Sequence, residues 1–282
     1  MTQVIPSIKQ MKQHELQVFS KTAILSGIRK VRQVGENDEF EHIRPYAQGD
    51  NFKSINWKAT SRTRELMVNQ YQNSRHQDIY CILDKGRSMK MPFDGMTLLD
   101  YSINSILSLS NIILKKYDNA GLISYSDKMG TILKSSAKKG QLERISQMLY
   151  NETTGFKESN FELLLQVTRR VISNRSIWLY YTNFETPHDL RRQLPYLRMM
   201  AKRHLVVVII FINTELLETS EMVCETKSDI YLRTFAEKTI MEKELIKRKL
   251  IQNDIQTVLT RPKDLSINVI NKYLEIKAKR LR

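Results

Sequence analysis

The stretch "DIYCILDKGRSM", residues 78–89, decides how this sequence folds. It begins with a short apolar run and turns polar at Asp84, which is followed by Gly86 and Ser88. A short apolar run bounded by polar residues predicts a buried strand that ends in a loop. The Asp-x-Gly-x-Ser loop allows two interpretations. It is either a site for a hard divalent ion, or a turn in which Asp84 caps the next segment and Gly86 permits the bend.

Strands and helices alternate from this stretch to the C-terminus. Further strands are predicted at residues 120–127, 130–136, 176–184, 204–212 and 255–261. Apolar residues at helical spacing predict helices at residues 96–117, 138–151, 160–173, 187–203, 228–252 and from 262 onward. This alternation predicts an α/β fold of the Rossmann type, with a mostly parallel sheet and helices on both faces. Ligands bind such sheets at the carboxyl ends of the strands, which is where Asp84 is expected.

The first part of the chain has a different character. Residues 11–25 predict a helix, and a polar stretch with turn signals follows, up to a possible strand at residues 65–72. We therefore expect residues 1–77 to form an N-terminal helix and an irregular segment with short strands, packed on a main domain of residues 78–282. Within that segment we expect the Ile55 and Trp57 side chains to anchor it on the main domain.

Composition and charge limit the classes of function. The chain has 282 residues, of which 41% are hydrophobic and 27% charged, as in ordinary globular proteins. Its net charge of +15 would attract nucleic acid, anionic lipid or acidic proteins, but the positive residues are spread over the whole sequence. No basic stripe with interleaved aromatic residues is present, so nucleic-acid binding is not favoured.

The cysteines and the apolar runs indicate the compartment. Cys81 and Cys224 are isolated and have no metal-ligand spacing, which favours a reducing environment over a disulfide framework. The longest apolar run, residues 204–212, is too short for a membrane helix and reads as a central strand. We expect a cytoplasmic protein.

The residues before and after position 78 resemble the bacterial family called domain of unknown function 58. Its members carry an Arg-x-Tyr-x-x-Gly-Asp segment, then Ile-x-Trp, then a Ser/Ala-Arg pair. The matching residues here are Arg44, Tyr46, Gly49, Asp50, Ile55, Trp57, Ser61 and Arg62. The resemblance implies that a von Willebrand factor A-like domain follows, opening with the strand that leads into Asp84.

The resemblance also implies a metal-ion-dependent adhesion site for Mg²⁺ or Mn²⁺. Its usual form is Asp-x-Ser-x-Ser, a threonine on a second loop and an aspartate after a third strand. Asp84 and Ser88 match the first loop, whereas Gly86 replaces the first serine. Ser159 falls at the threonine position and Asn183 at the second aspartate position. A single carboxylate among these positions predicts a degenerate site and weak or absent metal binding by the isolated chain. Asp127 and Glu185 are the neighbouring carboxylates that could complete it.

No set of catalytic residues emerges from the sequence. The five histidines are scattered and no phosphate-binding loop is present, so we expect neither an enzyme nor a small-molecule substrate. The resemblance implies a protein-interaction module that works with a MoxR-class AAA+ ATPase in a chaperone-like or assembly role. Family members often carry membrane helices before this region, which implies a longer form at the inner face of the membrane. The alternative is a basic protein that binds nucleic acid or an anionic surface, with an affinity that falls steeply with salt.

Overall fold

The computed structural model describes residues 38–48, 50, 52–73, 76–155, 157–222 and 226–279. The predicted helix at residues 11–25, together with Gly49 and Cys224, lies outside these residues. The described chain forms two compact units that divide between His76 and Gln77. The packing of residues 1–77 on the main domain stays a prediction.

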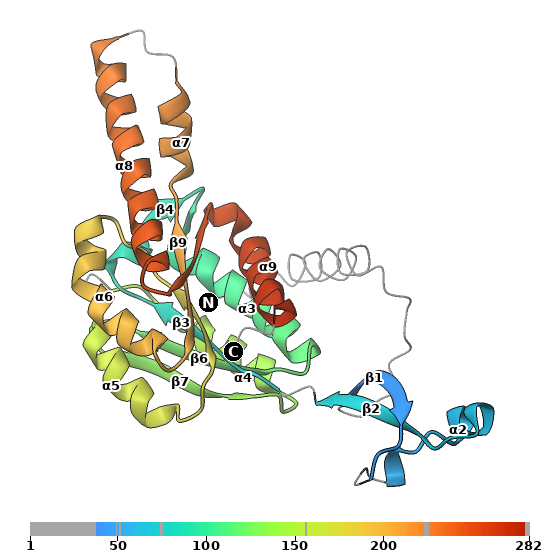
Figure 1. Ribbon diagram of the computed structural model, residues 1–282. Coiled ribbons are helices and arrows are strands. Elements are labelled where there is room, and N and C mark those ends of the chain that lie inside the picture. The colour runs from blue at the N-terminus through green and yellow to red at the C-terminus, as the bar shows by residue number, and fades with distance from the viewer. Residues whose placement is uncertain are drawn as a thin grey trace. The chain divides into compact units, whose positions relative to one another are not determined.

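A six-stranded sheet forms the centre of the larger unit (Figure 1). Its strands, in order across the sheet, are β10 (Gln256–Thr260), β9 (Leu205–Phe211), β8 (Ile177–Tyr181), β3 (Asp78–Asp84), β6 (Asn119–Tyr125) and β7 (Met129–Ser136). All neighbours are parallel except β7, which pairs antiparallel with β6 at the edge. When the six strands are numbered by their order in the chain and read from β7, the sheet has the order 3-2-1-4-5-6 of a doubly wound fold. The strand order reverses between β3 and β8.

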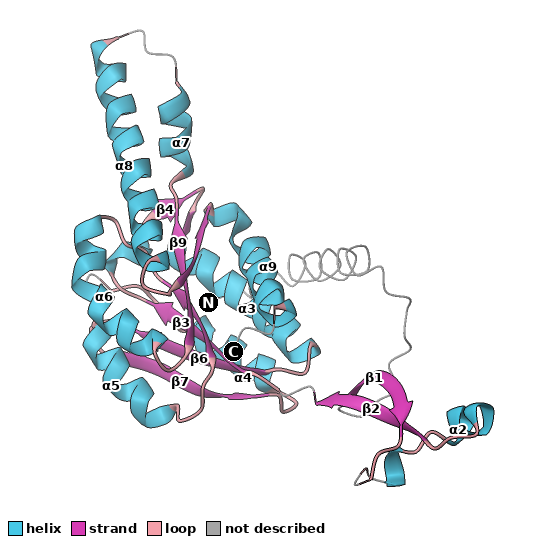
Figure 2. Ribbon diagram, in the orientation of Figure 1, coloured by secondary structure: helices cyan, strands magenta, loops and turns pink. Residues whose placement is uncertain are grey.

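Helices cover both faces of this sheet (Figure 2). On one face, Cys81, Leu83 and their neighbours pack against α3 (Leu98–Lys115), α4 (Gln141–Tyr150) and α9 (Leu265–Ala278). On the other face, Ile82, Tyr180 and their neighbours pack against α5 (Phe161–Val171), α6 (Pro187–Ala201) and the C-terminal part of α8 (Lys227–Ile251). Because both faces are buried, the strands are almost continuously apolar, which is why the sequence identified them.

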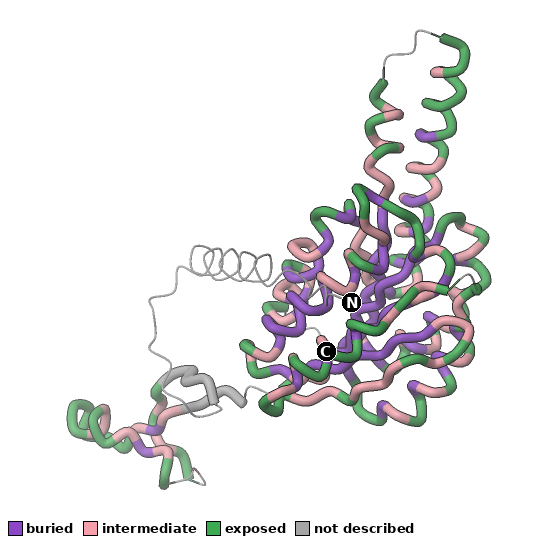
Figure 3. Tube along the Cα trace, turned by 180° about the vertical axis from the view of Figure 1, so that it is seen from behind, coloured by how far each residue is buried: buried purple, intermediate pink, exposed green. Residues whose placement is uncertain are grey.

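The α7 (Thr214–Glu221) and α8 helices form a pair that projects from the carboxyl edge of the sheet (Figure 1). Ile246 and Leu250 bury the C-terminal end of α8 in the core. The outer part of the pair is largely exposed (Figure 3). Among the residues that the structure describes, no helix is both long and apolar enough to cross a membrane.

The smaller unit is built on two antiparallel strands, β1 (Asp38–Pro45) and β2 (Met67–Asn73). A 3-10 turn (Phe52–Ser54) and the short helix α2 (Trp57–Thr63) lie between them in the chain. The Arg44 guanidinium donates to both Asp50 carboxylate oxygens at 2.6 and 2.7 Å, which closes the family-specific turn. Trp57 is 69% exposed, and its role as an anchor on the main domain stays a prediction. It stands at the first position of α2, and that helix buries none of its residues.

The predicted fold class is confirmed: an α/β protein with a mostly parallel sheet, helices on both faces and short strands before it. Three small features were not predicted. They are α2, α7 and the hairpin of β4 (Pro92–Phe93) and β5 (Met96–Thr97) after the 3-10 turn Arg87–Lys90.

Candidate functional site

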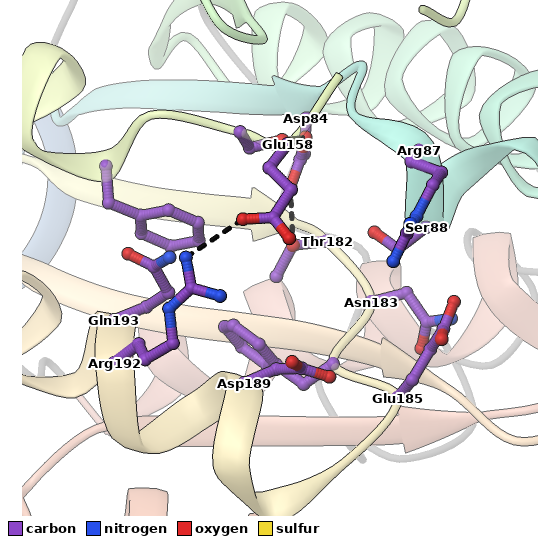
Figure 4. Close-up of a pocket in the computed structure, with 13 residues that line it drawn as sticks. Asp84, Arg87, Ser88, Glu158, Thr182, Asn183, Glu185, Asp189, Arg192 and Gln193 are labelled. Atoms are coloured by element: carbon purple, nitrogen blue, oxygen red, sulfur yellow. Dashed lines mark hydrogen bonds and ion pairs between the residues drawn. The ribbon is translucent and has the colours of Figure 1, made fainter. Parts of the chain in front are cut away.

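The carboxyl ends of β3 and β8 meet at the point where the strand order reverses, and a pocket lies there (Figure 4). Three loops line it: the one after β3, the one before α5 and the one after β8. Residues from all three were predicted from the sequence, namely Asp84, Ser88, Ser159 and Asn183. The structure therefore brings the four predicted residues to one pocket, at the place where doubly wound sheets bind ligands.

Asp84, the last residue of β3, is the buried centre of this pocket and is only 2% exposed. Its Oδ1 accepts hydrogen bonds from the Gly86 backbone N–H at 2.8 Å and from the Ser159 hydroxyl. Its Oδ2 accepts from the Thr182 hydroxyl at 2.7 Å. Burial raises the pKa of the Asp84 carboxyl, and these three hydrogen bonds act in the opposite direction. The carboxylate thus ties together all three loops.

The position of the Ser159 side chain explains why residue 86 is a glycine. The backbone at Gly86 has φ of −68°, a conformation open to any residue, so a turn does not require glycine here. A Cβ atom at this position, however, would overlap the Ser159 Oγ atom and lie 3.0 Å from Asp84 Oδ1. The Ser159 hydroxyl fills the space that a serine side chain would need in the Asp-x-Ser-x-Ser form of the loop.

Asn183 follows β8 and is engaged by a cation from a distant helix. The Lys243 ammonium of α8 donates to Asn183 Oδ1 at 2.8 Å and to the Phe184 carbonyl at 2.6 Å. Asn183 and Lys243 are each 6% exposed. The oxygen that would face a metal ion is thus held by a positive charge of the protein itself.

This donor set does not fit Mg²⁺ or Mn²⁺. Such ions need several hard oxygen ligands in near-octahedral geometry, usually with one or two carboxylates. Here Asp84 is the one carboxylate among the predicted ligands, and Gly86 offers no oxygen side chain. The Asn183 side-chain oxygen contacts the Lys243 ammonium. Within the described ranges, no three His, Cys, Asp or Glu side chains are arranged to hold a metal ion. The role of these four residues as metal ligands stays a prediction, and their geometry does not favour it.

The wider pocket is rich in carboxylates despite the basic composition of the chain. Asp84, Glu158, Glu185 and Asp189 line it, against the two guanidinium groups of Arg87 and Arg192. Glu158 pairs with Arg192 at 2.9 Å, as Figure 4 shows. Asp189 closes the capping box of α6 with Thr186. Asp127, suggested from the sequence as a further ligand, instead pairs with Lys157 at 2.8 Å.

Thr182 and Lys243 hold two of the predicted site residues in place and were not named from the sequence. Thr182 has a signal in retrospect, because it directly precedes Asn183 at the end of a buried strand and so reaches the same edge as Asp84. A sequence signal for Lys243 also exists, because this residue lies in the buried stripe of α8 with Ala236, Ile246 and Leu250. A lysine in an apolar stripe requires buried oxygen partners.

Comparisons with known proteins find one family and several similar structures. A model of the family "Protein of unknown function DUF58" matches residues 42–219. No curated protein sequence matches the chain significantly. Among solved structures, BatB from Bacteroides thetaiotaomicron is similar at 12% identity and a TM-score of 0.48, covering 71% of this chain and 98% of that one. The SpRpn10 VWA domain is similar at 11% identity and a TM-score of 0.42, covering 68% and 94%.

A third similar structure is proximal thread matrix protein 1 from the mussel byssus, whose MIDAS motif is occupied by zinc. It has 10% identity and a TM-score of 0.39, covering 72% of this chain and 48% of that one. Identities this low bear on the fold alone. The family match, by contrast, spans more than half of the chain and includes the end of β1, the Arg44–Asp50 turn and the pocket at Asp84. The chain is therefore a member of the DUF58 family, and its main domain is a doubly wound α/β sheet.

Proposed function

We propose that this chain is a non-enzymatic protein-interaction module, and that its docking face is the carboxyl edge of the sheet. The observation that carries the proposal is that the polar pocket at Asp84 and the projecting α7–α8 pair rise from the same edge. Because β3, β8 and β9 are parallel, the loops after β3 and β8 and the helix after β9 leave the sheet on one side.

The α8 helix supplies apolar contact surface to this face. Within its first three turns, Ile230, Tyr231, Leu232 and Phe235 are each more than half exposed. Contiguous exposed apolar side chains on a water-soluble unit mark interaction sites, and aromatic residues dominate binding energy at protein interfaces. A protein partner with an apolar groove is the ligand that suits this helix.

We propose a MoxR-class AAA+ ATPase as the partner, in a chaperone-like or assembly role in the cytoplasm, with a longer form of the chain at the inner face of the membrane. This choice of partner rests on what the family resemblance of the sequence implies. The free thiol of Cys81, buried in the sheet, is compatible with a reducing compartment. The alternative role in nucleic-acid binding is less well supported, because the pocket at the docking edge sets four carboxylates against two guanidinium groups and so offers a polyanion no basic surface.

Biolayer interferometry tests this proposal. The full chain is immobilised, and a purified MoxR-class ATPase is the analyte, in the presence of a non-hydrolysable ATP analogue. The double variant Tyr231→Ser/Phe235→Ser should weaken the Kd by about ten-fold or more, because it removes two exposed aromatic anchors. Tyr117→Ser is the matched control, since Tyr117 is 59% exposed but precedes β6 and so lies at the opposite edge of the sheet. Equal effects of the two changes, or no binding of the ATPase, would contradict the proposal.

A further inference from the structure

Lys243 is a buried cation of α8 that is bound to the loop after β8. Lysine is almost never fully buried unless it has partners, yet this side chain is only 6% exposed. Its partners are two neutral oxygens, Asn183 Oδ1 at 2.8 Å and the Phe184 carbonyl at 2.6 Å. An isostere without charge, such as methionine, would fill the same space in the apolar stripe of α8 at a lower desolvation cost.

Carboxylates lie near the Lys243 ammonium as well. Those of Glu185 and Asp189 favour its charged form electrostatically. Both acidic residues line the pocket at Asp84, so the positive charge lies beside a group of carboxylates. The ammonium therefore offsets negative charge at the same edge of the sheet where an adhesion site would use a divalent ion.

The geometry points to a replacement of the metal ion by the protein itself. Asn183 stands where the family resemblance places a metal-coordinating aspartate, and its side-chain oxygen contacts the Lys243 ammonium instead. A divalent ion and an ammonium cannot share one amide oxygen without strong repulsion. We propose that the Lys243 ammonium is a resident cation that orders the loop after β8 in place of Mg²⁺ or Mn²⁺, so that the pocket works without metal.

This replacement has a consequence for the docking face. In a metal-dependent site the ion orders the loops, whereas here the ordering group belongs to α8. Lys243 follows Tyr231 by twelve residues on one helix, so the apolar outer turns and the pocket loop are joined by a rigid rod about 18 Å long. The part of the inference that concerns docking rests on the proposed function, but the replacement of the metal does not.

Metal titration of designed variants tests the replacement without any partner. Wild type, Asn183→Asp and Asn183→Asp/Lys243→Met are treated with EDTA, and Mn²⁺ and Mg²⁺ binding is followed by calorimetry and thermal unfolding. The double variant regains a second carboxylate and loses the competing charge. It should gain saturable binding, with a rise in Tm of about 5 °C or more at ~100 times the Kd. Wild type and Asn183→Asp should show no saturable binding up to millimolar metal.

Two controls keep this test decisive. Asn183→Asp/Lys247→Met removes a half-buried lysine of the same helix, which pairs with Glu244, and should not bind metal. Without any metal, Asn183→Asp alone should raise Tm relative to wild type, because the Lys243 ammonium gains a carboxylate partner. The proposal is overturned if wild type or Asn183→Asp binds metal as tightly as the double variant, if the double variant binds none, or if Asn183→Asp lowers Tm in EDTA.

Discussion

Replacing Gly86 with alanine tests how tightly the loop after β3 is packed against the loop before α5. The new Cβ atom would overlap Ser159 Oγ and lie 3.3 Å from Ser159 Cβ and 3.0 Å from Asp84 Oδ1. The backbone conformation at Gly86 accepts alanine, so the cost comes from this contact and not from the turn. Relief requires the Ser159 hydroxyl to rotate away from Asp84, which leaves the buried carboxylate with one donor fewer.

Two effects set the size of the change. Overpacking of a close-packed site costs about 1–3 kcal/mol, and a lost hydrogen bond to a charged group costs about 1.5–3 kcal/mol. Because rotation of the hydroxyl exchanges the first cost for the second, we expect Gly86→Ala to lower the free energy of unfolding by about 2 kcal/mol. Urea denaturation followed by circular dichroism measures it.

The double variant Gly86→Ala/Ser159→Ala isolates the cause. It removes the overlapping oxygen, so its loss of stability should be smaller than the sum of the two single losses by about 1 kcal/mol or more. Additive losses, or a Gly86→Ala variant as stable as wild type, would refute the explanation of Gly86 by Ser159.

Three further predictions concern buried polar groups. Burial, and then the charges of Arg203 and Arg175, lower the pKa of His204 from 6.5 to about 4. Between pH 6.5 and 4 the unfolded chain therefore binds a proton that the folded chain does not, so the free energy of unfolding should fall by roughly 2 kcal/mol over this range. The midpoint of urea denaturation, measured against pH, should show this fall. The variant His204→Gln should make the midpoint less dependent on pH. Tyr180→Phe should leave Tm unchanged or raise it, because the buried Tyr180 hydroxyl has no hydrogen-bond partner among the described residues; a clear fall in Tm would disprove this. Lys277→Met should lower the free energy of unfolding by about 2–3 kcal/mol in a denaturant titration, because it removes the ammonium that lies 2.7 Å from the buried Asp118 carboxylate. A loss below about 0.5 kcal/mol would contradict this prediction.

The central sheet was predictable because its strands are buried on both faces and so appear as short apolar runs. Residues 204–212 predicted β9, which spans Leu205–Phe211, and residues 228–252 predicted α8, which spans Lys227–Ile251. The short hairpin after the pocket was missed although its turn carries a signal. Asp94 and Gly95 both have positive φ, at 45° and 77°, which is the pattern of a tight Asp-Gly hairpin turn.

The site was predictable only where a loop follows a recognisable strand. Asp84 and Asn183 follow two apolar strands, and their positions at one edge of a parallel sheet follow from that alone. The hydrogen bond from the Lys243 ammonium to Asn183 could not be predicted, because Lys243 is sixty residues away in the chain. It reaches the loop only through the packing of α8 on the sheet. The sequence therefore indicated a weakened metal site, whereas the structure contains a cation of its own in that place.

Hydrogen–deuterium exchange of the full chain with and without a purified MoxR-class ATPase would locate the docking face. We expect slower exchange in the loops at residues 84–90, 157–160 and 182–186 and in the outer turns of α8, since these elements share the carboxyl edge of the sheet. The same protection should persist when free Mn²⁺ is added, because the pocket is proposed to work without metal. Protection confined to residues 38–73 or to the opposite edge near residues 115–119, or none at all, would contradict a docking face built on this pocket and helix.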